Sequence, residues 1–531
     1  MVDPTNNMIV WLALIPLLAG LACVPMVNFP RVCRGVGVLG FGATLALAVS
    51  LLVAQGETSG GVFVSQMGGW AAPYGITLVF DALSGLMVAA ASLVALGTYV
   101  FAFGSLPART ERRYFHPLVC FMMLGVNLSF LTGDLFNLFV AFEIMLMASY
   151  GLLVIGGGRA QLRQAYKYVV MNLLASSVFV IAAGMAYGMF GTLNMADLGR
   201  LAGEQAAAGT LPAGFTALGV LFLFVFALKA GVFPLWFWLP DTYPTLPTAI
   251  AGLFGGVLTK VGLYAIARTF SLIFIQPGAD GEAGFNILVV ILGVGAGMTM
   301  LVGVLGALAY TGLRRVLCLM LVVGVGYSLL GIATMTGGSL EGAAFYMAQS
   351  MLVMAGLFLC GGLIERAGGG TDEASATAGL LQKPGQVWLS VLFFAGLMAV
   401  VGLPPTSGFY GKLVVLREAL GGSLWGVGVV GLLVGALTLL AALRVWSTTF
   451  WGPPPEAPPE APPEVSPEVS QATASGDARR GPRVSEVVGV VVLVGASLGL
   501  GFVPGPAIGA AGVAGRQLAE PEPYFRAVLD N

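Results

Sequence analysis

Residues 229–270 read KAGVFPLWFWLPDTYPTLPTAIAGLFGGVLTKVGLYAIARTF and carry the strongest indication of the fold. Two lysines, Lys229 and Lys260, lie inside apolar runs, and Gly231 and Pro234 follow the first lysine closely. Proline removes a backbone donor and clashes with the preceding helical turn. Broken helices at membrane depth occur only where they face protein or a water-filled cavity. The stretch therefore predicts a broken membrane helix beside a continuous one, each containing a buried lysine.

The composition of the whole chain is that of a membrane protein. Of its 531 residues, 57% are hydrophobic and only 9% are charged, against roughly 25% charged in soluble domains. The net charge of -1 argues against a nucleic-acid partner held by phosphate attraction. The five cysteines are far apart and there is a single histidine, so we expect no metal site and no cofactor.

Fourteen segments are apolar and long enough to cross a bilayer, which requires about 20 helical residues. The sequence therefore predicts an all-α polytopic membrane protein with about 14 transmembrane helices. The segments are 8–27, 35–55, 80–104, 115–132, 135–155, 168–190, 213–240, 247–267, 285–310, 316–334, 342–364, 386–415, 422–447 and 485–505.

The basic residues of the loops predict the orientation of the chain. Loops after the odd-numbered segments hold 16 Lys and Arg residues. The chain is expected in the cell (inner) membrane. The positive-inside rule places these loops on its cytoplasmic side and both termini on the extracytoplasmic side. The other loops hold five cations, which are Arg200, Arg268, Arg417, Arg516 and Arg526.

One segment, 452–484, does not resemble a membrane helix. It begins GPPPEAPPEAPPEVSPEVS and is rich in Pro, Glu and Ala. This composition cannot form a packed core and predicts an extended cytoplasmic linker. The linker is either a tolerated loop insertion or a docking segment for a partner.

Four charged side chains lie near the middle of apolar segments: Glu143, Lys229, Lys260 and Lys412. Each costs on the order of 3 kcal/mol to place at the bilayer centre. Arginine stays charged at physiological pH, whereas a buried lysine can lose its proton. Burial favours the neutral form of a lysine, and a nearby carboxylate favours the charged form. The pattern predicts a proton relay; a static Glu–Lys tether would explain one pair but not three lysines.

A second group of helix breakers precedes Lys412, in GLPPTSGFYGKLVVL (402–416), and includes Pro404 and Pro405. Kinked packing alone would explain either break taken singly. Broken helices in two halves of a chain are typical of inverted repeats with an ion path at each break.

These stretches resemble the antiporter-like subunits shared by respiratory complex I and the Mrp-type multisubunit Na⁺/H⁺ antiporters, and most of all the D-type subunits of the Mrp complexes. The resemblance extends over nearly the whole chain except the linker. It is carried by FLTGDLFNLFVAFEIMLMASYGLLV (130–154), by the stretches 229–270 and 402–416 quoted above, by RVWSTTFWG (444–452) and by PEPYFRAVL (521–529).

The resemblance implies a role for each buried charge. Glu143 matches the glutamate of the fifth helix, which modulates the proton affinity of Lys229 in the seventh. Lys260 matches the central lysine of the eighth helix, and Lys412 the lysine of the twelfth helix near the exit. Protons are expected to pass along a lateral hydrated axis through these residues.

The resemblance also implies a domain organisation. Helices 4–8 (115–270) and 9–13 (285–451) are expected to form an inverted repeat, with helices 7 and 12 discontinuous. Helices 1–3 (1–114) precede the repeat, and helix 14 with a C-terminal tail (485–531) follows the linker. The implied assembly is a hetero-oligomer of membrane subunits that exchanges Na⁺ for H⁺ and contains no enzymatic site in this chain.

The second half departs from the family pattern. Met320, Gln349 and Met354 stand where titratable groups are expected. Gln349 and Ser350 can hold water but cannot carry charge, so water is one way to bridge Lys260 and Lys412. Altered coupling in a divergent relative is the other.

Three further polar residues lie at segment ends. Asp81 and Asp134 either cap helix N-termini, which favour anions, or belong to an ion entrance. The only histidine, His116, precedes Pro117 at a segment edge, and we expect it to be structural rather than a relay member.

Two other functions compete with the antiporter. A proton-pumping subunit of complex I or a membrane-bound hydrogenase would use the same four charged residues, with energy from electrons in other subunits. A scaffold without transport activity, or a subunit serving bicarbonate uptake, would account for the titratable groups missing from the second half.

Overall fold

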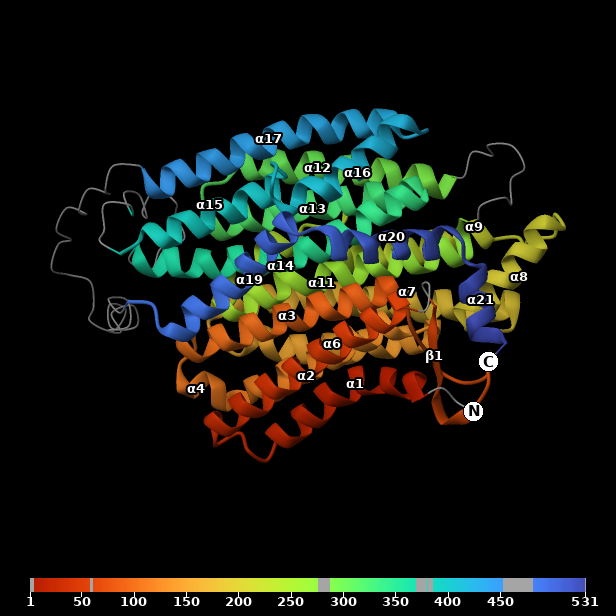
Figure 1. Ribbon diagram of the computed structural model, residues 1–531, viewed down its shortest axis with the longest axis horizontal. Coiled ribbons are helices and arrows are strands. Elements are labelled where there is room, and N and C mark those ends of the chain that lie inside the picture. The colour runs from red at the N-terminus through yellow and green to blue at the C-terminus, as the bar shows by residue number, and fades with distance from the viewer. Residues whose placement is uncertain are drawn as a thin grey trace.

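The helices of the chain lie side by side with their long axes in a common direction (Figure 1). A computed structural model describes residues 4–57, 61–275, 287–368, 380, 385–451 and 481–530. Residues 452–480 of the predicted linker lie outside the described residues. Eleven described helices are long and apolar enough to cross a membrane, and three further apolar helices are shorter.

Each of the fourteen predicted segments overlaps one of these helices. The seventh and twelfth segments end early as continuous helices, at Ala230 and Val401, because each is interrupted. In the other direction, α7 begins at Arg159 rather than near 168 because a basic, exposed turn extends the helix beyond its apolar part. The fourteen helices are α1 (Pro4–Cys23), α2 (Pro30–Glu57), α3 (Ala82–Ser105), α5 (His116–Leu131), α6 (Leu135–Val154), α7 (Arg159–Phe190), α9 (Phe215–Ala230), α11 (Thr248–Thr269), α12 (Ile287–Ala309), α13 (Leu313–Thr334), α14 (Gly337–Ala367), α15 (Val387–Val401), α17 (Trp425–Phe450) and α19 (Val484–Phe502). A further helix, α16 (Ser407–Gly421), begins within the twelfth predicted segment.

The predicted break after Lys229 is present. α9 ends at Ala230, and Gly231 follows in the left-handed conformation with φ 76°. Helical structure resumes at Trp238 in the short α10 (Trp238–Thr242). Pro234, which lies between the two helices, is joined to Phe233 by a cis peptide bond.

The predicted break before Lys412 has a similar form. α15 ends at Val401, and Gly402 adopts the left-handed conformation with φ 84°. Pro404 and Pro405 lie in the interruption, joined by a cis peptide bond, and α16 begins at Ser407. Glycine adopts a positive φ without the steric cost that a Cβ atom brings, so a glycine at this position favours the end of each helix.

The core lies around α11, α13 and α14, whose apolar windows are completely buried within the chain. α14 packs against α11 on one side and α16 on another, and α11 also packs against α9. In Figure 1, α11 and α14 lie in the middle of the molecule, with α1 and α17 on opposite flanks. A polar side chain on the inner helices is therefore shielded from the surface by protein.

Both termini lie at one end of the helices, and α4 (Ala108–Thr110) lies at the other (Figure 1). The terminal end carries a hairpin of β1 (Phe63–Gln66) and β2 (Thr77–Phe80), paired antiparallel with Phe63 opposite Phe80. It also carries α8 (Met195–Ala207) and α21 (Glu522–Leu529), which were not expected from the sequence. A third unexpected helix, α20 (Gly505–Ala519), follows α19 and packs against α14 and α3. The remaining short elements are η1 (Met67–Gly69), η2 (Glu111–Phe115), η3 (Tyr243–Thr245) and η4 (Phe270–Phe274).

Candidate functional site

Lys229 lies in the last turn of α9, immediately before the break. Its side chain is buried, and its Nζ has no hydrogen-bond partner in the part of the chain that the structure describes. Nζ lies 4.8 Å from the centre of the Phe142 ring of α6. A ring face attracts a cation more weakly than a carboxylate does. Among the described residues, no hydrogen bond or ion pair therefore stabilises the charged form of this lysine.

Glu143, the predicted partner of Lys229, lies next to Phe142 on α6 but forms no ion pair within the described residues. Its carboxylate accepts a hydrogen bond from the Ser176 hydroxyl of α7. The residue is half-buried and lines an outward-facing cavity of about 500 Å³. The other lining residues are apolar: Leu118, Phe121, Phe139, Val140, Ile144, Met147 and Ala148. The carboxylate thus faces the surface of the chain from an apolar setting.

Lys260 lies in the middle of α11, where every residue is buried. Its Nζ approaches the Gly255 carbonyl of the same helix at 3.4 Å, which is long for a hydrogen bond. As with Lys229, no acidic side chain forms an ion pair with it in the described ranges. Its charged form has little stabilisation from protein groups.

The Lys412 side chain reaches across the second break. Its Nζ, on α16, donates to the carbonyl oxygens of Val400 at 2.8 Å and Val401 at 3.0 Å. These carbonyls end α15, where the last turn has no intrahelical donors and the helix dipole favours a cation. The ring of Tyr327 lies 4.2 Å from the same Nζ. The break at Gly402 therefore exposes the acceptors that hold this lysine.

The predicted residues lie on helices that pack in succession. α6 packs against α7, α7 against α9, α9 against α11, α11 against α14, and α14 against α16. Glu143, Lys229, Lys260 and Lys412 are therefore ordered across the width of the molecule. That protons pass along this order, as the sequence resemblance implies, stays a prediction.

Gln349 of α14 lies between the helices of Lys260 and Lys412. Its Oε1 accepts from the Ser407 hydroxyl at 3.2 Å, and Ser407 contacts Ser497 of α19 at 3.1 Å. The Nε2 of Gln349 has no partner among the described residues. An unpartnered buried amide can bind water. Ser350, Met320 and Met354 are also buried, so this link is polar but uncharged.

Asp81 and Asp134 cap helices. Asp81 accepts from the Ser84 backbone nitrogen at the start of α3, and Asp134 accepts from that of Asn137 at the start of α6. Burial raises the pKa of the Asp134 carboxyl. The capping interpretation is confirmed for both residues, and an additional role at an ion entrance stays a prediction.

An ion pair between Asp81 and Arg268 was missed by sequence reasoning. The Arg268 Nη2 lies 2.6 Å from the Asp81 Oδ2, and both side chains are almost completely buried. The guanidinium also lies over the rings of Tyr264 and Tyr524. The sequence groups Arg268 with the loop cations, but it belongs to the last turns of α11. Lys260, Tyr264 and Arg268 are four residues apart, which places three polar groups on one helix face. This spacing could have indicated from the sequence that Arg268 belongs to the helix.

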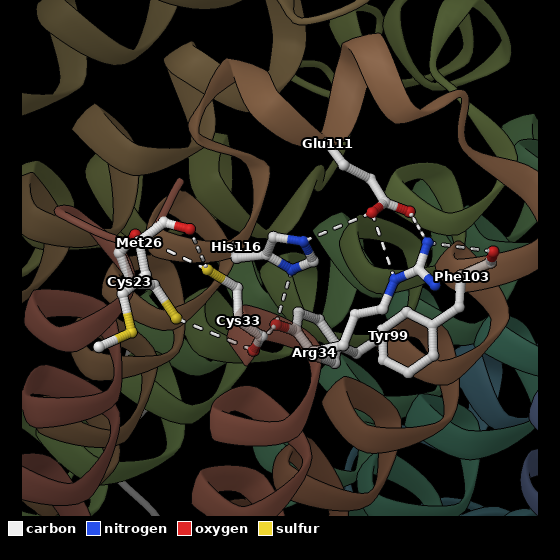
Figure 2. Close-up of polar contacts among 8 residues, drawn as sticks. All are labelled: Cys23, Met26, Cys33, Arg34, Tyr99, Phe103, Glu111 and His116. Atoms are coloured by element: carbon white, nitrogen blue, oxygen red, sulfur yellow. Dashed lines mark hydrogen bonds and ion pairs between the residues drawn. The ribbon is translucent and has the colours of Figure 1, made fainter. Parts of the chain in front are cut away.

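His116 lies in the group of helices formed by α1, α2, α3 and α5 (Figure 2), whereas Lys229, Lys260 and Lys412 lie on α9, α11 and α16. It contacts Tyr99 and Glu111. The expectation that it belongs to no relay with the lysines agrees with this placement.

Comparison with known proteins shows which family this chain belongs to. Residues 132–438 match the family described as NADH:quinone oxidoreductase/Mrp antiporter, TM. The chain is 41% identical, over 84% of its length and 87% of the relative, to a D-type Na⁺/H⁺ antiporter subunit of Alkalihalophilus pseudofirmus. It is 33% identical, over 96% and 95% of the two chains, to a probable D-type K⁺/H⁺ antiporter subunit of Rhizobium meliloti.

Among solved structures, a chain of the Mrp complex from Dietzia sp. superposes with a TM-score of 0.86 at 30% identity, covering 99% of both chains. The matched region 132–438 includes Glu143, Lys229, Lys260 and Lys412. The chain therefore belongs to the membrane subunits shared by Mrp antiporters and NADH:quinone oxidoreductase, and within them to the D-type subunits of the Mrp antiporters.

Proposed function

We propose that this chain is the proton-translocating subunit of a multisubunit antiporter that exchanges a monovalent cation, Na⁺, for H⁺. The observation that carries the proposal is the set of three buried lysines whose nearest partners are carbonyls and aromatic rings. Burial without a carboxylate partner lowers the cost of releasing a proton. A static tether would instead hold each lysine in an ion pair.

Glu143 acts on Lys229 without direct contact in this proposal. Coulomb interactions act over several ångströms where the effective dielectric constant is low. An ionised Glu143 favours the charged form of Lys229, and neutralising that carboxylate favours release of the proton towards Lys260. Water beside Gln349 and Ser350 then carries the proton to Lys412.

The proposed topology has fourteen membrane crossings, made by the eleven long helices and the three shorter apolar ones. Helices 4–8 (115–270) and 9–13 (285–451) form an inverted repeat. The similar interruptions at Gly231 and Gly402, each with a positive φ, support this assignment. The end with both termini faces the extracytoplasmic side, and the basic end with α4 faces the cytoplasm.

Other membrane subunits are expected to cover the cavity beside Glu143. A carboxylate exposed to lipid costs several kcal/mol, and the rest of this cavity is apolar. A neighbouring subunit would remove the carboxylate from lipid and provide a route for protons between subunits. The Mrp complex of Dietzia sp. and the names of the relatives support a hetero-oligomer.

A proton-pumping subunit of a redox complex is the second candidate, because the matching family also includes NADH:quinone oxidoreductase. Na⁺ is preferred as the exchanged cation on the relative with 41% identity, whereas another relative is named for K⁺. In both candidates this chain moves ions and makes or breaks no covalent bond in a substrate.

Everted vesicles that contain the complete complex, from cells without other antiporters, distinguish these functions. A proton gradient is first established by respiration, and NaCl, KCl or choline chloride is then added. We expect NaCl to dissipate the gradient, and vesicles lacking this subunit to show no response. A gradient that NADH generates only when the complex is present, with no response to either cation, would support the redox pump instead.

A further inference from the structure

A polar cluster outside the lysine series surrounds His116, the only histidine of the chain (Figure 2). His116 is completely buried at the start of α5. The cluster joins α2, α3, η2 and α5 at the basic end of the molecule. Its other members are Arg34, Tyr99, Glu111 and the backbone carbonyl of Cys33.

Tyr99 connects His116 to the start of α2. Its hydroxyl lies 2.7 Å from the His116 Nδ1 and 3.0 Å from the Cys33 carbonyl oxygen. On the other side of the ring, the His116 Nε2 lies 3.7 Å from the Glu111 Oε2. Glu111 is itself bound by Arg34, with Nη2 at 2.6 Å and Nε at 3.2 Å.

The number of protons limits which contacts can form together. The Tyr99 hydroxyl has one proton, and the Cys33 carbonyl can only accept. When Tyr99 donates to Cys33, the His116 Nδ1 must donate to the Tyr99 oxygen. The other ring nitrogen, Nε2, faces a carboxylate and is favourable there only if it also bears a proton. All three contacts are satisfied together when both ring nitrogens are protonated.

A neutral imidazole loses one of these contacts. With its proton on Nε2, it takes the Tyr99 hydrogen bond at Nδ1, and the Cys33 carbonyl loses the Tyr99 hydroxyl as a donor. With its proton on Nδ1, it turns a lone pair towards Glu111. Imidazole is the side chain that changes between these forms near neutral pH.

We propose that His116 is a proton-binding site, separate from the lysine series, whose protonation fastens the start of α2 to α3 and η2. The bound proton completes a continuous series of polar contacts from Glu111 through His116 and Tyr99 to the Cys33 carbonyl. Loss of the proton releases the Tyr99–Cys33 contact, while the contacts of Arg34 with Glu111 and Phe103 remain.

Among the titratable groups around this site, His116 is the one that we expect to bind the proton. The thiols of Cys23, Cys33 and Cys120 are buried and free, and buried apolar surroundings keep thiols inert. On η2, Arg112 is exposed, and Arg113 donates to the Ile155 carbonyl at 3.0 Å, away from the ring.

The backbone beside the site is suited to a change between two states. Tyr114 has a positive φ of 62°, and Arg113 also departs from helical geometry. A non-glycine residue with positive φ persists only when surrounding contacts hold it. Glu111, three residues earlier, supplies such contacts to Arg34 and His116.

The single histidine makes the test direct. The full chain, purified with a histidine-free tag and placed in lipid nanodiscs, is labelled with ¹⁵N-histidine so that the ring nitrogens report only His116. We expect both nitrogens to carry protons at low pH and one to lose its proton through a single transition as the pH rises. An imidazole that remains in one neutral tautomer from pH 5.5 to 9 would overturn the proposal.

Hydrogen exchange of the amides at 24–36, corrected for the intrinsic effect of pH, tests the link to α2. Exchange should rise about fivefold across the transition, the effect of one lost hydrogen bond. Tyr99→Phe keeps the ring and should remove the rise while His116 still titrates; His116→Gln should show no transition. A wild-type titration without a change in exchange would also overturn the proposal, because protonation would then not fasten α2.

Discussion

At the scale of single residues, the three buried lysines differ from the buried Arg268 in their partners. Lys260 has only a distant carbonyl near its Nζ, whereas Arg268, two turns along the same helix, has a carboxylate at 2.6 Å. Two buried cations on α11 thus have different electrostatic environments. The first is suited to changing charge, and the second is suited to keeping it.

Lys260→Met separates transport from stability. Methionine has similar length and no charge to desolvate, so we expect thermal stability equal to or above that of the wild type. Cation-linked proton flux should fall to background because the carrier of the proton is gone. Stability comes from thermal unfolding of the purified chain, and flux from vesicles that contain the assembled complex. A destabilised variant that retained flux would show that the lysine is structural.

Asp81→Asn should have the opposite effect on stability. It leaves the Arg268 charge buried without its partner, and breaking a buried pair in this way costs about 3–5 kcal/mol. The double variant Asp81→Asn/Arg268→Gln removes both charges and should recover much of the loss. Thermal unfolding of the three proteins in detergent measures the difference. Equal losses in the single and double variants would contradict a stabilising ion pair.

At the scale of elements, the interruption between α15 and α16 positions Lys412. A Cβ at Gly402 would lie 3.0 Å from the Lys412 Cδ, and the backbone there has φ 84°. Gly402→Ala should therefore destabilise by about 1–2 kcal/mol and displace the lysine from the Val400 and Val401 carbonyls. We expect proton flux in vesicles to fall severalfold.

Gly209→Ala is the matched control for this prediction. Gly209 also has a positive φ of 66°, but it lies in open space after α8, outside the helices that carry the three lysines. The substitution carries a similar backbone cost without touching the site. A lower flux in Gly402→Ala than in Gly209→Ala supports the positioning of Lys412 by the break. Equal flux in the two variants would contradict it.

The sequence predicted these interruptions well because glycine and proline act locally. Gly231, Pro234, Pro404 and Pro405 have the same effect on a helix whatever packs against them. The Asp81–Arg268 pair was not predicted because it joins residues that only the packing of α3 and α11 brings together. Similarly, α20 and the hairpin β1–β2 contain few features that distinguish them from loops in a sequence dominated by long apolar runs.

At the scale of the whole molecule, Glu143 differs from Lys229, Lys260 and Lys412 because it is only half-buried and faces outward. The resemblance pairs it with Lys229, yet it lies in a surface cavity and accepts from Ser176. The spacing of residues along a helix gives no information on which face a neighbouring subunit will cover. The isolated chain therefore has an incomplete environment at this position.

Met147→Cys tests whether another subunit covers this cavity. Met147 lines the cavity and is 58% exposed, while all five native cysteines are buried. A lipid-soluble maleimide should label the variant at least tenfold faster in the isolated chain than in the assembled complex. The wild-type chain supplies the background. Equal labelling in both preparations would show that no neighbouring subunit covers this face.

The central claim is that a buried lysine of this chain carries protons, and the most direct measurement is Na⁺-dependent proton flux in everted vesicles that contain the complete complex with Lys229→Ala. Lys167→Ala is the matched control, because Lys167 is an exposed lysine that pairs with Asp241 at 3.2 Å. With assembly verified for both, we predict that Lys229→Ala abolishes the flux and that Lys167→Ala retains it. Full flux in the Lys229→Ala complex would contradict the account.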